Sequence, residues 1–136
     1  NPSSISQAAA VEALNGDQSF INTRALEFKK RRDFVVHALN NITRLTCVNP
    51  QGAFYVFPNC KKTINKKTSS GKIIKNDTDF ATYLLEETGV AIVQGSAFGL
   101  EGYFVYSHIA SEYHGYTMKA FTLEEEMNAA WGKIRS

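Results

Sequence analysis

Helical and strand-like segments alternate along this sequence, and their order restricts the possible folds more than any other feature. Apolar residues recur at the helical period after Ser3 or Ser4, after Asp17, after Asp77 or Thr78, and after Thr122. Four short runs of β-branched and aromatic residues lie at 45–48, 53–57, 90–93 and 103–109. The order ααββαββα predicts an α/β (α+β) fold, a two-layer sandwich in which helices cover one face of a mixed sheet of about four short strands.

Turn residues mark the ends of these segments. We expect Gly16 to end the first helix in a left-handed conformation and Gly89 to end the third helix. The second helix is expected to end near residue 40. Pro50 and Gly52 lie between the first two strand-like runs, which predicts a β-hairpin over 45–57.

Length, charge and cysteine content limit the class of protein. The 136 residues, of which 43% are hydrophobic, suffice for a single domain over 1–136 with one core. Fifteen basic residues against 13 acidic ones leave a net charge of +2, which predicts no nucleic-acid or membrane partner. Cys47 and Cys60 are too few for a disulfide framework, so we expect reduced thiols and a cytoplasmic location. Since residue 1 is not Met, we expect a segment of a longer chain.

No complete catalytic or metal-binding motif is present in the sequence. The stretch SSGK at 69–72 lacks the earlier glycine, the preceding strand and the final hydroxyl of a phosphate-binding loop. His37, His108 and His114 lie too far apart in sequence for a compact metal site. The lysines within 61–76 predict a Lys-rich surface loop, and polyanion binding by this loop stays an open alternative.

Four segments, taken in order, carry a family resemblance. They are NPSSISQ at 1–7 with ALNG at 13–16, PQGAFY at 50–55, DFA through LE at 79–86, and GVA through GSAFG at 89–99. Together they resemble the C-terminal, small-domain segment of class I aminotransferases, in the bacterial aspartate aminotransferase-like branch of pyridoxal phosphate (PLP) fold type I. The resemblance extends from residue 1 to about residue 104.

The resemblance implies a PLP-dependent transaminase that exchanges amino groups between aspartate and 2-oxoglutarate and is a homodimer. In such enzymes the small domain closes over amino acid and 2-oxo acid substrates, while a large domain upstream holds the cofactor and the Schiff-base lysine. The family's Ser-Lys motif is absent from this sequence. We therefore expect no catalytic residue, bound cofactor or metal in this chain alone, and no activity without the missing large domain.

Two positions correspond to substrate contacts in the family. Phe54 matches a residue that lines the substrate channel, although a place in the sheet core suits Phe54 equally well. Val105 occupies the position of the arginine that binds the substrate α-carboxylate, and valine offers no donor for that purpose. No arginine lies between Arg44 and Arg135 to replace it, so we expect this binding function to be lost. Residues 112–121 are interpreted as an insertion relative to the family.

An alternative hypothesis is that the chain has the small-domain fold but takes no part in transamination. Val105 and the altered segment that follows it would also suit a non-catalytic binding or interaction module derived from the aminotransferase small domain. Titration of the isolated domain with aspartate, glutamate and PLP distinguishes a ligand-binding role from a purely structural one.

Overall fold

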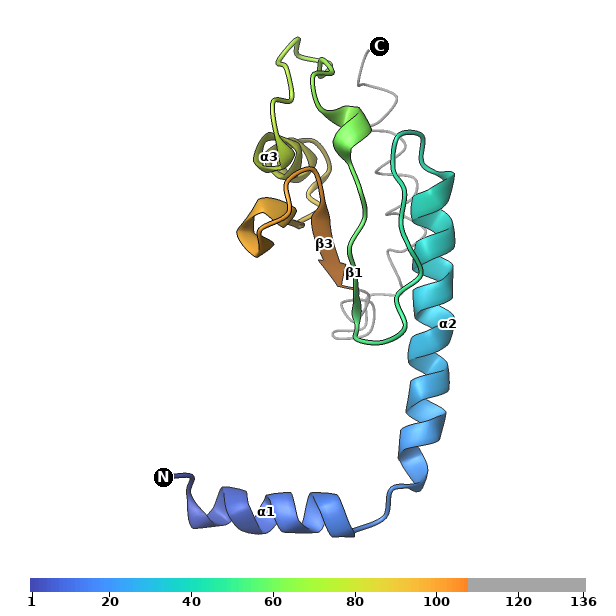
Figure 1. Ribbon diagram of the computed structural model, residues 1–136, viewed down its shortest axis with the longest axis vertical. Coiled ribbons are helices and arrows are strands. Elements are labelled where there is room, and N and C mark those ends of the chain that lie inside the picture. The colour runs from blue at the N-terminus through green and yellow to red at the C-terminus, as the bar shows by residue number, and fades with distance from the viewer. Residues whose placement is uncertain (108–136) are drawn as a thin grey trace. The chain divides into compact units, whose positions relative to one another are not determined.

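The computed structural model describes residues 1–107 and divides the chain into a unit over Asn1–Lys30 and a unit that begins at Arg31. Its elements are the helices α1 (Ser4–Asn15), α2 (Ser19–Asn41) and α3 (Asp77–Thr88), the 3-10 helices η1 (Lys61–Thr63) and η2 (Gly95–Phe98), and the strands β1 (Tyr55–Val56), β2 (Val93–Gln94) and β3 (Phe104–Ser107), as labelled in part in Figure 1. The predicted insertion at 112–121 and the predicted helix after Thr122 lie outside the described residues.

In the first unit, α1 begins and ends where the sequence predicts, but the backbone conformation of the residue that ends it differs from the prediction. The Ser3 hydroxyl accepts a hydrogen bond from the Ser6 amide at 3.2 Å, as expected of a helix cap. Gly16 was expected in a left-handed conformation, and this is wrong, because its backbone is extended at φ −75° and ψ −169°. A Cβ at this position would lie 2.7 Å from the Glu12 carbonyl oxygen, so glycine is needed here for close approach.

The described strands form one antiparallel sheet in the order β1-β3-β2. Tyr55 lies opposite Ser107, and Val93 lies opposite Val105. We expected a mixed sheet of about four strands, and the described residues contain three strands with no parallel pair. The architecture nevertheless combines helices with a small sheet, as the sequence predicts.

The predicted hairpin over 45–57 does not form. The run at 45–48 contributes only an isolated antiparallel bridge between Thr46 and Asn59, and β1 pairs with β3. Next to this bridge, the Asn40 side chain of α2 accepts a hydrogen bond from the Cys47 N–H at 2.8 Å and donates one to the Cys47 carbonyl at 2.9 Å. The backbone groups of Cys47 therefore pair with a side chain and not with another strand.

The ends of α3 also differ from the prediction in one detail. The cap residue is Asn76, whose side chain accepts from the Asp79 amide, in place of the expected Asp77 or Thr78. Gly89 ends the helix in the expected left-handed conformation at φ 74°. The Val90 amide then donates to the Thr88 hydroxyl at 3.2 Å, and β2 starts only at Val93, three residues later than expected.

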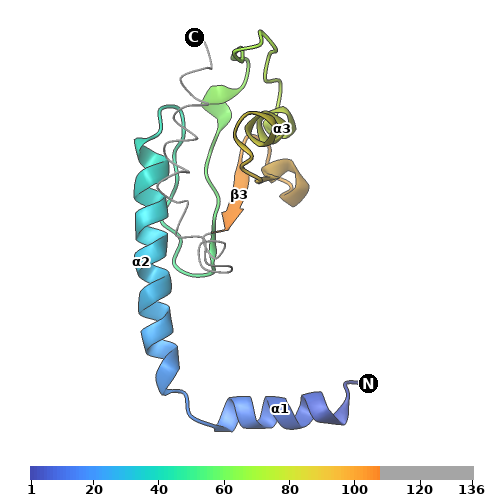
Figure 2. The same ribbon diagram turned by 180° about the vertical axis from the view of Figure 1, so that it is seen from behind.

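The core lies on one face of the sheet, beneath α3 and the C-terminal half of α2. Val56 and Phe104 point to this face and are 1% and 0% exposed. The rings of Phe104 and Phe80, from α3, lie 5.6 Å apart, and Leu39 of α2 joins the same cluster. Figure 2 shows both helices from behind. Each of these fully buried side chains contributes about 1.5 to 3 kcal/mol.

Candidate functional site

The opposite face of the sheet is open in the described structure and is apolar. Because strand residues alternate between faces, Tyr55, Val105 and Ser107 point away from the core that holds Val56 and Phe104. Val93 pairs with Val105 and shares this face. Tyr55 is 47% exposed and Val93 is 46% exposed. We refer to this surface as the open sheet face, and it is the first candidate for a functional site.

Phe54 precedes β1 and borders the open sheet face. Its side chain is 48% exposed, and its ring meets the Tyr55 ring edge-on with the centroids 5.4 Å apart. The Phe54 carbonyl oxygen accepts a hydrogen bond from the Ser107 hydroxyl at 3.4 Å. This exposure contradicts a place for Phe54 in the sheet core, and a place in a substrate channel stays a prediction.

Val105 lies in the middle of the open sheet face and is half-buried. Its partner across the strands is Val93, so this part of the face offers two branched aliphatic side chains and no hydrogen-bond donor. The structure thus places Val105 near Tyr55, which in turn contacts Phe54. The two residues singled out in the sequence belong to neighbouring parts of one surface.

An aromatic cluster continues the open sheet face and was missed in the sequence. The Phe57 and Tyr103 rings stack with centroids 5.3 Å apart, and Phe98 meets Phe57 edge-on at 6.5 Å. The Lys61 ammonium lies 5.1 Å from the Tyr103 ring centroid. The Asn59 amide donates to the Tyr103 hydroxyl at 3.2 Å. The alternation of aromatic residues at 55 and 57, and of residues 103, 105 and 107, is the sequence signal that would have revealed this face.

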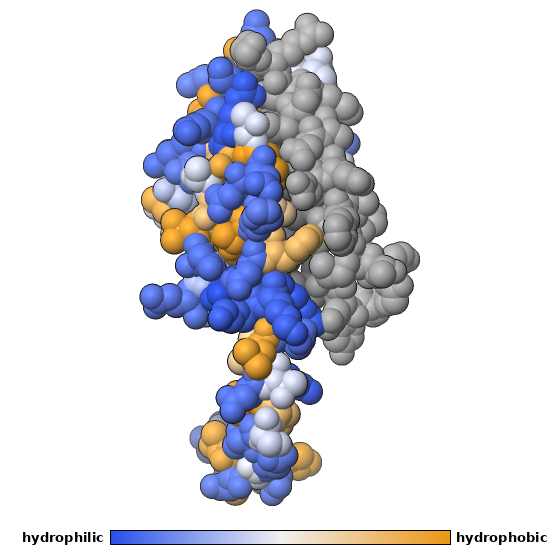
Figure 3. All heavy atoms as spheres, turned by 90° about the vertical axis from the view of Figure 1, so that its right-hand side faces the viewer, coloured by the Kyte–Doolittle hydropathy of each residue, from blue (hydrophilic) through white to orange (hydrophobic). Residues whose placement is uncertain are grey.

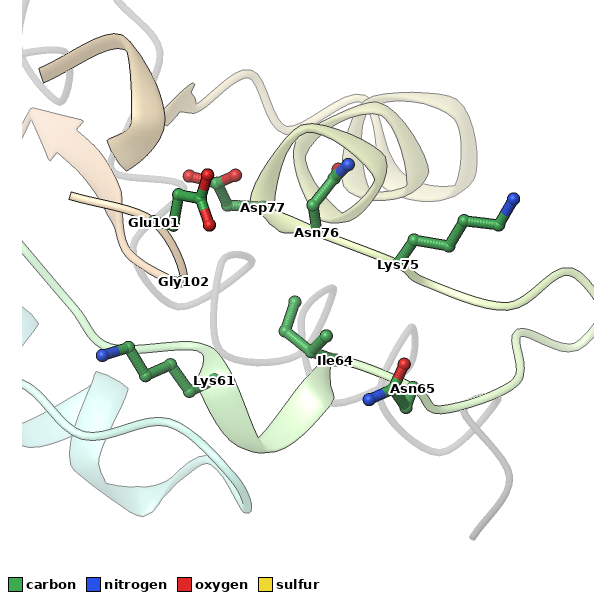
Figure 4. A pocket seen from close by; sticks show the side chains of 8 residues that line it. All are labelled: Lys61, Ile64, Asn65, Lys75, Asn76, Asp77, Glu101 and Gly102. Atoms are coloured by element: carbon green, nitrogen blue, oxygen red, sulfur yellow. The ribbon is translucent and has the colours of Figure 1, made fainter. Parts of the chain in front are cut away.

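A second candidate is a pocket of about 340 Å³ at the N-terminal end of α3. Its lining includes Asp77, Glu101, Lys61 and Lys75, and Figure 4 shows the two lysine side chains extending in opposite directions. Asp77 is only 2% exposed, and its carboxylate accepts a 2.6 Å hydrogen bond from the Ser96 amide. That bond ties α3 to η2, so Asp77 has a structural partner already.

The buried cysteines are not nucleophiles. Burial raises the pKa of the Cys60 thiol to about 12, and the nearby negative charge of Asp77 adds to this shift. Burial also raises the pKa of Cys47 to about 11. Both thiols therefore stay protonated at neutral pH, and the reactive thiolate is not available.

The described residues do not fit PLP on their own. A PLP site requires a lysine facing the cofactor and several donors around its phosphate. The described lysines are solvent-exposed, apart from the half-buried Lys66, and the carboxylates of Asp77 and Glu101 would repel a phosphate in the α3 pocket. Among residues 1–107, no group of three or more His, Cys, Asp or Glu side chains could hold a metal ion. No helix in the same range is long and apolar enough to cross a bilayer.

Comparison with known proteins identifies the family. The family model described as "Aminotransferase class I and II" matches residues 1–110. The chain belongs to this aminotransferase family. It is 54% identical over 111 residues to the probable aspartate/prephenate aminotransferase of Rickettsia felis and 56% identical over 111 residues to the aspartate aminotransferase of Rhizobium meliloti. Each alignment covers 82% of this chain and 27% of the relative.

A solved aminotransferase structure has the same fold. The crystal structure of the aspartate aminotransferase from Rhizobium meliloti superposes with a TM-score of 0.89 and 48% identity, over 98% of this chain and 32% of that one. The alanine aminotransferase from Pyrococcus furiosus superposes with a TM-score of 0.72 and 28% identity. The chain therefore spans less than a third of the length of these aminotransferase relatives.

Proposed function

We propose that this chain acts as the substrate-closing small domain of a PLP-dependent aminotransferase that transfers amino groups between aspartate and 2-oxoglutarate. The observation that carries this proposal is the superposition on an aspartate aminotransferase over nearly the whole chain, at 48% identity. The names of the Rickettsia relatives add prephenate as a candidate keto-acid substrate. A cytoplasmic location stays an expectation.

The missing part of such an enzyme would supply the cofactor, its lysine and the phosphate donors, because the described residues of this chain do not. PLP, when bound there, supplies the electron withdrawal that labilises the substrate α-hydrogen. This chain contributes the open sheet face, where Phe54 and Tyr55 would form an aromatic wall beside the substrate. α1 exposes Ile5, Val11 and Leu14 at 83%, 61% and 80%, on different sides of the helix, and these apolar side chains suit contact with the large domain or with the second subunit of a homodimer.

Val105 limits how tightly this domain can bind the α-carboxylate of a substrate. An arginine at this place would form two parallel charge-assisted hydrogen bonds with a substrate carboxylate. Loss of a buried charge pair of that kind typically costs about 2 to 5 kcal/mol, which corresponds to tens to thousands of times in affinity. We expect weak binding of the α-carboxylate by this chain.

A chimera tests the proposal. Residues 1–110 of this chain replace the matching segment of the Rhizobium meliloti aspartate aminotransferase, and aspartate transamination is measured with Val105 and with Val105→Arg. The matched control is Val93→Arg, which adds the same charge to the paired position on the same face. We expect Val105→Arg to raise kcat/KM at least tenfold over both the Val105 chimera and the Val93→Arg control.

Two outcomes would count against the proposal, and they are distinguishable. Equal transamination by the Val105 and Val105→Arg chimeras would refute the assignment of position 105 to the carboxylate. A folded chimera that binds PLP, judged from its absorbance, and yet stays inactive with either residue would refute the small-domain role itself.

The alternative function is a non-catalytic binding or interaction module. The apolar Val93 and Val105 pair favours it, because a transaminase gains nothing from an uncharged carboxylate site. Calorimetric titration of the isolated chain with aspartate, glutamate and PLP provides the test. Saturable binding of one of these compounds would support a ligand-binding module, and a complete lack of binding would count against it.

A further inference from the structure

The positive charge of this chain is concentrated in one short segment. Residues 61–75 contain six lysines and no acidic residue, whereas the rest of the sequence carries more acidic than basic residues. The net charge of +2 therefore hides two regions of opposite sign. Segregation of this kind produces a local positive potential that an overall charge does not reveal.

Residues 65–75 of this lysine segment form an ordered hairpin. The Ile74 amide donates to the Lys66 carbonyl at 2.9 Å, and the Thr68 amide donates to the Lys72 carbonyl at 2.8 Å. Gly71, at φ 85°, allows the turn between the two arms. Thr68 and Ile74 anchor the hairpin because they are 2% and 1% exposed. A fixed backbone reduces the entropy that the segment would lose on binding a partner.

The six lysines of residues 61–75 have no counterions within the described part of the chain. None of the six lysines forms an ion pair with a residue in 1–107, and Lys61 lies over the Tyr103 ring. By contrast, Lys30 in α2 pairs with Glu27 at 2.8 Å. In Figure 1 the hairpin lies at the top, and the described surface at the top of Figure 3 is mostly hydrophilic.

One side of the hairpin combines charge with an apolar centre. Lys67 and Ile73 form an antiparallel bridge, so their side chains share one face, and Lys75 follows two residues after Ile73 on the same side. The neighbouring residue Ile74 points the other way, into the core. Ile73 is 43% exposed between these two lysines. An apolar centre with a charged rim is the arrangement found in protein interfaces.

We propose that this hairpin face, formed by Lys67, Ile73 and Lys75, binds an acidic segment of a partner protein that places an apolar side chain on Ile73. Charge complementarity identifies the acidic partner, and the exposed isoleucine requires an apolar group among its carboxylates. A nucleic acid fits less well, since residues 61–76 contain no arginine for base edges and no aromatic ring for stacking.

Fluorescence anisotropy with the whole chain tests this surface. The probe is a labelled peptide of eight glutamates with one central leucine, and two comparison probes are the same peptide with alanine for leucine and an oligouridylate of equal charge. The test variant carries Lys67→Gln and Lys75→Gln. The matched control carries Lys29→Gln and Lys30→Gln, which removes the same charge from α2. All four lysines are solvent-exposed, so folding should persist, and circular dichroism checks it.

We expect the hairpin double variant to weaken peptide binding about fivefold at low salt, while the α2 variant binds like the parent chain. Binding should weaken as salt rises, because exposed charges are screened. Ile73→Thr should reduce the affinity for the leucine peptide and leave the alanine peptide unaffected. Equal losses in the two double variants would overturn the proposal, as would tighter binding of the oligouridylate than of the leucine peptide.

Discussion

The buried carboxylate of Asp77 offers the sharpest test of how this fold is stabilised. Asp77 is 2% exposed at the start of α3, and its side chain accepts the Ser96 amide at 2.6 Å, across 19 residues of sequence. Asp79 lies in the same first turn but is more exposed, and it accepts the Lys75 amide at 3.0 Å. Both carboxylates interact with the helix dipole, so a comparison of the two isolates the long-range bond.

The size of the effect follows from these contacts. A hydrogen bond to a charged group contributes about 1.5 to 3 kcal/mol. Asp77→Ala also leaves the Ser96 amide without its acceptor and opens a small cavity, so we expect a loss of about 2 to 4 kcal/mol in the free energy of unfolding. Asp77→Asn retains an acceptor oxygen and should cost roughly 1 kcal/mol less. Asp79→Ala should cost about 0.5 to 1 kcal/mol.

Urea unfolding followed by circular dichroism measures these differences, and hydrogen exchange locates them. In Asp77→Ala the Ser96 amide should exchange faster than in the parent chain, whereas Asp79→Ala should leave that amide protected. Equal losses of stability in Asp77→Ala and Asp79→Ala would refute the reasoning. Unchanged exchange at Ser96 in Asp77→Ala would do so as well, because it would show that the bond does not hold η2.

Three further changes have expected outcomes. Since the folded pKa values of Cys47 and Cys60 lie above the ordinary value of 9, these thiols stabilise the fold below pH 9, and stability should fall between pH 9 and about pH 11 to 12. Each thiol contributes at most about 1.4 kcal/mol per pH unit, and urea titrations of Cys60→Ala should show a shallower decline. Gly95→Ala should destabilise the fold by more than about 2 kcal/mol, because its Cβ would overlap the Leu100 carbonyl oxygen. Gly52→Ala, whose Cβ meets nothing within 4 Å, should change stability by under about 0.5 kcal/mol in the same assay. Asn40→Ala should cost about 1 to 3 kcal/mol and speed exchange of the Cys47 amide; a change below 0.5 kcal/mol would contradict this role.

The helices could be predicted from the sequence because their signals are local. Ser3 and Gly89 end helices by contacts within a few residues, and the sequence contains all the information that such contacts need. The strands could not be predicted equally well. Within 45–48 only Thr46 is bridged, to Asn59, and both backbone groups of Cys47 bond to the Asn40 side chain of the preceding helix. The hydrophobic periodicity of a sequence contains no signal for contacts of this kind.

The residues of the candidate site could also be predicted from the sequence only in part. Phe54 and Val105 could be singled out from motifs, because each stands at a recognisable position in the sequence. The stacking of Phe57 on Tyr103 could not, since it joins residues 46 positions apart whose proximity depends on the pairing of β1 with β3. The register of a sheet is a tertiary property, and a shift of one residue would move these rings to the opposite face.

The strand order β1-β3-β2 has a consequence for synthesis of the chain. Both outer strands hydrogen-bond only to β3 within the described sheet, and β3 is the last of the three to be translated. A nascent chain that ends before Phe104 therefore contains two strands with no partner and a core without the Phe104 ring. Unpaired strand edges and exposed apolar surface are what chaperones recognise. The ribosome must deliver β3 before this sheet can begin to form.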